Sequence, residues 1–308
     1  MFYFKANIVY TYLMKNREYT IHGPGLTEET KKEVSDFLAD YDTEALEPID
    51  GEVEKTSEIE QAILEINQYR EEIAAELELP KPVPITTAQI HLLPPSVFAE
   101  RYPDYPDWSE GVHENLGHGI FIKYRQDANP ELLKMFLLHE GIHMDSHHAY
   151  FTKNQNEDPI DSLSGQTRSG YSTWTPYKEK GGNYLSGFNE AVVQKITWEK
   201  IRAHLTRTKI NISYENEIVV LDLLIEKIAI KFNEEKTEVW KRIKKGLFTG
   251  QMMHLRRINE TYGPNALKIL AMLTDEYGTT TEKIKKYFQT DSSEERLKLE
   301  EELLVKIK

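Results

Sequence analysis

The stretch NPELLKMFLLHEGIHMDSHH, from Asn129 to His148, decides how the rest of the chain is interpreted. Its first residues predict the start of a helix, because Asn129 can serve as the N-cap and Pro130 suits the first helical position. Glu131 then places a negative charge near the positive end of the helix dipole. The following turns are apolar on nearly every side. We therefore predict a helix that is buried in a core rather than one that lies on a surface.

His139-Glu140-Gly141-Ile142-His143 stands near the middle of this stretch. Side chains four residues apart lie on one face of a helix, so His139 and His143 can direct imidazole nitrogens to the same point. Glu140 lies about 100° further round the helix and can reach a water held at that point. This spacing is typical of a zinc site with a general base. A catalytic zinc also needs a third protein ligand and an open position for water.

The third ligand has to come from another part of the chain. His147 is two turns beyond His139, roughly 12 Å along the helix axis, which is too far for the two to share a metal. The longer H-E-x-x-H-x-x-G-x-x-H pattern fails as well, because Asp145 and Ala149 stand where it requires Gly and His. A helical pattern begins again at Gly187. A glutamate in the first turn of that second helix is a candidate, if the two helices pack together.

HEGIH followed by Asn189-Glu190-Ala191 at the start of a later helix resembles the gluzincin branch of zinc metallopeptidases, the thermolysin-like core and its minimal relatives. The resemblance implies that His139, His143 and Glu190 bind Zn²⁺ and that Glu140 activates the attacking water. It also implies a cleft between a mixed α/β part and a helical part. The expected activity is that of a zinc-dependent metalloendopeptidase acting on a peptide or protein substrate.

The same resemblance implies a substrate-binding strand just before the metal helix. We expect a strand over 117–124 that forms the upper edge of the cleft, where unpaired backbone groups bind a peptide largely without regard to its sequence. Gly117 and Gly119 would allow close approach of the peptide next to Ile120. One residue departs from the family pattern, because Gln194 stands where gluzincins often have an acidic residue that orients a zinc histidine.

Amide hydrolysis also needs a hydrogen-bond donor for the oxyanion that forms. Between His148 and Gly187 the chain is polar and aromatic with little periodicity, so we expect a long loop that walls or covers an active site. Tyr184 is the first candidate for the donor. Tyr171, Tyr177 and His148 compete for this role, and ordinary packing of the Tyr184 ring is the alternative interpretation.

Composition restricts the class of protein. The 308 residues contain no cysteine, so neither disulfides nor thiolate ligands contribute, and 39% hydrophobic with 29% charged residues fit a soluble globular protein. No apolar run approaches the ~18 residues of a membrane-spanning helix, and the apolar amino terminus alternates like a strand rather than resembling a signal peptide. We therefore expect a cytoplasmic protein without a membrane partner.

The net charge of −13 is unevenly distributed. Residues 27–79 contain eighteen acidic and four basic side chains, which leaves the rest of the chain near neutrality. The acidic side chains are expected on a solvated face, with an exchangeable cover or docking surface as the alternative. Because binding to a phosphate backbone depends on clustered Lys and Arg, this balance disfavours nucleic acid as a partner.

The periodicity predicts an α+β, predominantly helical fold: a zincin-like core with a small mixed β-sheet, an active-site helix and a helical C-terminal lobe. We expect three segments: 1–84 with a β-hairpin and acidic helices, 85–206 as the catalytic core, and 207–308 as the helical lobe. Strands are expected at 2–14, 17–22, 88–92 and 117–124. Helices are expected at 27–41, 57–78, 129–148, 188–206, 215–233, 236–246, 250–261, 264–277, 280–288 and 292–307.

Two alternative functions belong to other classes. H-E-x-x-H also arises by chance, so the helix can be structural, as in a zincin-like binding protein without turnover. Alternatively, the chain is a catalytically latent regulatory protein whose helical C-terminal lobe binds a partner or DNA. Peptide cleavage that a chelator blocks and zinc restores rejects the binding protein. A salt-dependent shift on mixing with DNA favours the regulatory protein, and no binding at low salt removes it.

Overall fold

The computed structural model of the chain describes residues 20–23, 26–44, 47–103, 105, 110–114, 119–125, 129–152, 163–175, 182–202, 214–273 and 278–305. The structure is α+β and mostly helical with small mixed sheets, which confirms the predicted fold class at this level. It contains two compact units, one of Met1–Gln166 with Lys200–Leu205 and one of Thr167–Glu199 with Thr206–Lys308. The finer division into segments 1–84, 85–206 and 207–308 stays a prediction.

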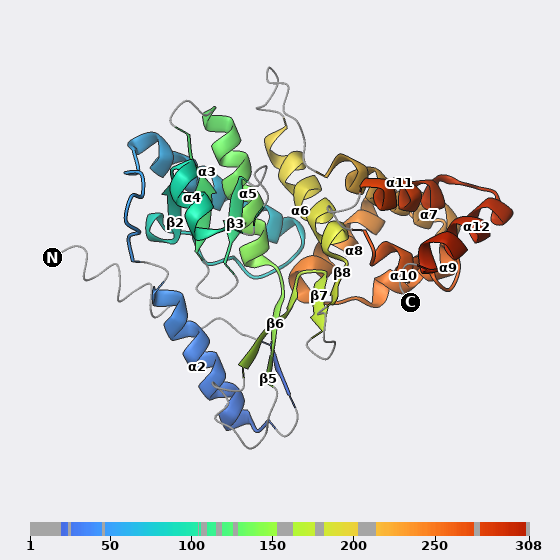
Figure 1. The fold of residues 1–308 in the computed structure, drawn as a ribbon, viewed down its shortest axis with the longest axis horizontal. Helices are drawn as coiled ribbons and strands as arrows, with labels where there is room; N and C mark the ends of the chain where they lie inside the picture. Colours follow the sequence, from blue (N-terminus) through green and yellow to red (C-terminus); the bar gives the residue numbers. More distant parts are fainter. Residues whose placement is uncertain are drawn as a thin grey trace. The chain divides into compact units, whose positions relative to one another are not determined.

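The first unit contains a three-stranded sheet with the strand order β2-β4-β3. Strand β2 (Ile90–Leu93) runs parallel to β4 (Ile120–Lys123), and β3 (Gly111–His113) runs antiparallel to β4 on its other side. Helix α4 (Pro95–Arg101) packs on this sheet (Figure 1). Their shared core is formed by Leu93, Phe98, Val112 and Phe121.

Helices α3 (Ser57–Glu76) and α5 (Pro130–Asp145) pack against each other in the same unit (Figure 1). As predicted, Asn129 caps α5: its Oδ1 accepts a hydrogen bond from the Glu131 amide at 2.9 Å. The helix is buried along most of its length, from Leu133 to Met144. The prediction of a buried helix over this stretch is therefore confirmed, although the helix ends at Asp145 rather than at His148.

Helix α2 (Glu28–Glu44) covers a second, separate core in this unit. Its Val34 and Leu38 pack with Ile21 of β1 (Thr20–His22) and Tyr150 of β5 (His148–Thr152). Strands β1 and β5 pair in parallel, although they are far apart in sequence. The hairpin partner expected at 2–14 lies outside the described residues, so the hairpin stays a prediction.

Strand β2 differs from the half-buried strand that its alternating sequence predicts. All four residues are buried, and a 3-10 turn (Thr87–Gln89) precedes them. The polar member of the strand, His91, stacks on Phe121 at 4.8 Å between ring centroids and donates from Nδ1 to Glu52 Oε2 at 3.1 Å. The Glu52 carboxylate is a partner for His91, so this polar residue can occupy a core position. A pattern that only separates apolar from polar residues cannot indicate such a pairing.

Strands are present where the sequence predicts a loop. Strands β6 (Leu163–Ser169), β7 (Ser172–Thr175) and β8 (Gly182–Tyr184) pair antiparallel in that order. The expectation of a largely irregular connection between the metal helix and the next helix is therefore wrong. These strands are rich in Ser, Thr and Gly, and they lack the apolar alternation by which half-buried strands are found.

Helices form most of the second unit. The expected helices near 188, 215 and 236 are α6 (Ser186–Ile201), α7 (Glu215–Phe232) and α8 (Lys236–Thr249). The segments expected at 250–261 and 264–277 contain shorter helices. The expected break between them is present at Gly263, which adopts a φ of +120° and is followed by Pro264. They are η2 (Met253–Leu255), α9 (Arg256–Tyr262) and α10 (Ala266–Leu270), followed by α11 (Gly278–Gln289) and α12 (Ser293–Leu304). None of the described helices is long and apolar enough to span a bilayer.

The Glu52 carboxylate allows a test of the first unit by pH. Burial alone would raise the pKa of Glu52, but hydrogen bonds from His91, Lys55 and the Ile49 amide outweigh it and lower this pKa from 4.5 to about 2. A lowered pKa in the folded state stabilises the protein above about pH 4.5, and this stabilisation is lost as the pH falls towards 2. We expect Glu52→Gln to lower the free energy of unfolding by about 2 to 3 kcal/mol at pH 5.5 and by less than about 1 kcal/mol at pH 2.5.

Urea unfolding at the two pH values measures this difference. The exposed Glu47→Gln variant is the matched control, and its stability should follow that of the wild type at both pH values. A deficit of Glu52→Gln that is equal at pH 5.5 and pH 2.5 contradicts the assigned role of the ionised carboxylate.

Candidate metal centre

Helix α5 brings the two predicted histidine ligands to one point. The distance between His139 Nε2 and His143 Nε2 is 3.1 Å, and the ring centroids are 4.8 Å apart. Two nitrogen ligands of a tetrahedral zinc, each at about 2.0 to 2.1 Å from the metal, lie about 3.3 Å from each other. The arrangement of the two imidazoles therefore fits a shared metal ion, as the i,i+4 spacing predicts.

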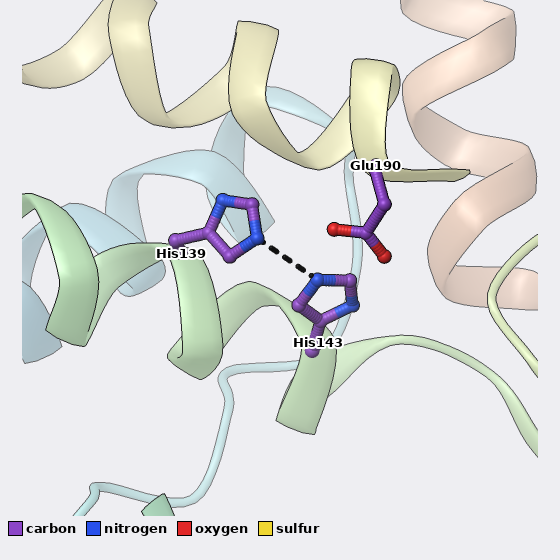
Figure 2. Close-up of side chains that lie close together, drawn as sticks. All are labelled: His139, His143 and Glu190. Atoms are coloured by element: carbon purple, nitrogen blue, oxygen red, sulfur yellow. Dashed lines mark hydrogen bonds between the residues drawn. The ribbon is translucent and has the colours of Figure 1, made fainter. Parts of the chain in front are cut away.

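Glu190 of α6 is the third member of the group. Figure 2 shows its carboxylate directed towards the imidazoles of His139 and His143. One ligand atom from each of the three residues lies within 4.8 Å of the others, and among the described residues no other set of three or more His, Asp or Glu side chains meets this condition. The group could hold a metal ion. Two imidazole nitrogens and a carboxylate oxygen form a donor set that suits zinc.

The residue before Glu190 anchors the start of α6. Asn189 Oδ1 accepts a hydrogen bond from the Tyr171 amide at 2.8 Å. Gly170 permits this contact: it has a φ of +56°, and a Cβ on it would lie 2.4 Å from Asn189 Oδ1. Asn189 thus joins the β6–β7 turn to the first turn of α6. The sequence shows the Asn-Glu pair but gives no indication of what the asparagine holds.

The expected general base, Glu140, is buried in α5 with 8% of its surface exposed. Strand β3 lies against it: a Cβ on Gly111 would lie 2.9 Å from Glu140 Oε1 and 3.2 Å from its Cγ. A glycine at the first position of β3 therefore leaves room for the Glu140 carboxylate. The role of Gly111 has no signal in the sequence, because nothing local relates this residue to a glutamate 29 positions later.

The carbonyl of His143 is held by several donors at the C-terminal end of α5. Ser146 donates to it from its amide at 3.1 Å and from Oγ at 2.7 Å, and His148 Nε2 donates to it at 3.1 Å. His148 Nε2 is used in this capping contact. The role of His148 as an oxyanion donor stays a prediction.

The tyrosines considered as oxyanion donors have different surroundings. Tyr171 is fully buried, donates to the Ile243 carbonyl at 2.7 Å and lies 2.7 Å from His254 Nε2, so its hydroxyl is used within the core of the second unit. Burial also raises the pKa of Tyr171 well above its usual value. Tyr184 ends β8 and is partly buried, and its role stays a prediction. Tyr177 lies outside the described residues.

The expected substrate-binding edge requires a correction. Strand β4 is the central strand of its sheet, since Ile120 is opposite Ile90 of β2 on one side and His113 of β3 on the other. The carbonyl of Gly119 accepts a hydrogen bond from the Glu114 amide at 3.0 Å. The expectation that this strand forms the exposed edge is therefore wrong, because strand order depends on long-range pairing. Gly117 lies outside the described residues.

Comparison of the chain with protein-family models, curated proteins and solved structures finds no match. The resemblance to gluzincins therefore stays a prediction, which depends on the H-E-x-x-H motif and on Asn189-Glu190-Ala191.

Proposed function

We propose that this chain is a zinc-dependent metalloendopeptidase of the gluzincin type, with His139, His143 and Glu190 as the metal ligands. The single observation that supports it most is the approach of His139 Nε2 and His143 Nε2 to 3.1 Å on a buried helix. The adjacent Glu140 is what distinguishes the proposal from a purely structural metal site. A structural zinc has four protein ligands, whereas three ligands leave a position for water.

Glu140 provides the proton transfers in this proposal. When bound, zinc lowers the pKa of a water in its open position to about 7 and polarises the scissile carbonyl. The Glu140 carboxylate accepts the proton of the attacking water and then returns it to the leaving amine. Gly111 of β3 lies close to this carboxylate and limits where it can move.

The proposed substrate is a peptide or protein segment, as the resemblance to gluzincins implies. Its scissile carbonyl has to lie near Glu140, whose carboxylate is beside Gly111 of β3.

The main experiment compares wild type with Glu140→Gln. We expect about one zinc per chain in both proteins, because the side chain at position 140 is not a ligand, and a loss of peptide hydrolysis of about 10²-fold or more in the variant. Metal analysis and cleavage of a quenched peptide library measure the two quantities. Hydrolysis by Glu140→Gln at the wild-type rate excludes the assigned base. Cleavage that a chelator does not affect excludes the metallopeptidase.

A second experiment tests the ligand that is most distant in sequence. Glu190→Ala should lower zinc affinity by at least about 10-fold, because a site with two imidazoles has lost its only anionic ligand. Glu238→Ala, which removes an exposed glutamate from α8, is the matched control and should bind zinc as the wild type does. Calorimetric zinc titration measures both. Equal affinity in Glu190→Ala and Glu238→Ala rules out Glu190 as a ligand.

A third experiment tests the contact between β3 and the base. Gly111→Ala places a Cβ where the Glu140 carboxylate lies, so the carboxylate has to move. We expect kcat/KM to fall by about 10-fold or more while zinc content stays at the wild-type value, since no ligand is touched. Combining Gly111→Ala with Glu140→Gln should cause little further loss of activity, because both changes act on the same group. Full additivity of the two losses contradicts this mechanism.

A further inference from the structure

Arg70 of α3 forms a buried ion pair with the last residue of the metal helix. The Arg70 side chain is 1% exposed. Its Nε donates to Asp145 Oδ2 at 2.7 Å, and its Nη2 donates to Asp145 Oδ1 at 2.6 Å. Two parallel N–H···O bonds define both the distance and the orientation of the pair, which a single ammonium group cannot do.

The guanidinium is itself held in place by α3 and by the segment that follows it. Its Nη1 donates to Asn67 Oδ1 at 2.6 Å, and its Nη2 also donates to the Val83 carbonyl at 3.0 Å. Asn67 is in turn bonded to the backbone of Ile85, with its Nδ2 donating to the carbonyl and its Oδ1 accepting from the amide, both at 2.8 Å. Arg70 therefore joins α5 to α3 and to the backbone of the segment that follows α3.

Arg70 also touches α5 at a second point, inside the H-E-x-x-H motif. A Cβ on Gly141 would lie 3.2 Å from Arg70 Cδ and 3.1 Å from Ile85 Cδ1. The aliphatic part of Arg70 thus packs on the helix backbone next to Glu140. The charged part binds Asp145, two residues after His143. The two contacts lie on either side of His143 along the helix, so they oppose both sliding and rotation of the segment that carries His143 and Glu140.

We propose that Arg70 is a positioning residue for the metal centre, acting through Gly141 and Asp145. The inference rests on the proposed function, because it assigns His143 as a ligand and Glu140 as the base. Arg70 and Asp145 carry opposite charges, so removing both leaves the net charge near the metal unchanged. We therefore expect the ion pair to affect metal binding by fixing the position of His143, as residues that hold the ligands of a metal site do.

The double variant Arg70→Met/Asp145→Leu separates positioning from stability. Replacing a buried ion pair by apolar residues of similar volume leaves no unpaired buried charge, so the variant should fold with near wild-type stability. We nevertheless expect a zinc affinity about 10-fold or more below that of the wild type, and a changed visible spectrum of the cobalt-substituted protein. Lys134→Met is the matched control, because it breaks the more exposed α5–α3 ion pair of Lys134 with Glu65. Its zinc affinity and cobalt spectrum should match those of the wild type.

The results separate this inference from the proposed function. A folded double variant with wild-type zinc affinity and an unchanged cobalt spectrum overturns the positioning role, whether or not the wild type cleaves peptides. A wild type that binds zinc without cleaving peptides overturns the peptidase and leaves the zinc measurements as the test of Arg70. Absence of zinc binding in the wild type overturns both.

If the double variant does not fold, Arg70→Lys provides the same test. Lysine keeps the charge but loses the paired geometry, so we expect zinc affinity at least about 3-fold below that of the wild type. Wild-type affinity in Arg70→Lys overturns the positioning role.

Discussion

The placement of two imidazoles and a carboxylate on one largely apolar helix, with His139 and Glu140 buried and His143 partly buried, is the constraint on which the rest of the structure depends. Burying a polar group is unfavourable unless it has a partner, so a helix that carries His139, Glu140 and His143 has to be held with its polar side chains directed at a common target. The structure meets this requirement from two sides. Strand β3 leaves room for the carboxylate at Gly111, and α3 holds the helix through Arg70.

Specific hydrogen bonds also hold the C-terminal end of α5. Donors from Ser146 and His148 converge on the His143 carbonyl, and the paired hydrogen bonds of Arg70 hold Asp145 at the end of the helix. Such contacts matter because a metal ligand is useful only within a few tenths of an ångström of its position. They account for a glycine inside the H-E-x-x-H motif, where a larger residue would meet the stem of the arginine.

The accuracy of the sequence-based predictions follows the range of the interactions involved. The N-cap at Asn129, the burial of α5 and the approach of His139 to His143 depend on neighbours within four residues, and the structure confirms them. The order β2-β4-β3 depends on pairing between distant segments, and the expectation of an edge strand was wrong. Strands β6 to β8 were missed because their Ser- and Thr-rich sequences lack apolar alternation.

The sequence by itself determined the helix that carries His139 and His143, its buried character and two nitrogen donors on one face, because helical periodicity converts a spacing of four residues directly into proximity. Only the tertiary structure decided which strand lies beside Glu140 and that Arg70, 75 positions before Asp145, holds the end of this helix. Neither contact has a local signal, since a glycine, an arginine and an aspartate acquire these roles only when distant segments pack together.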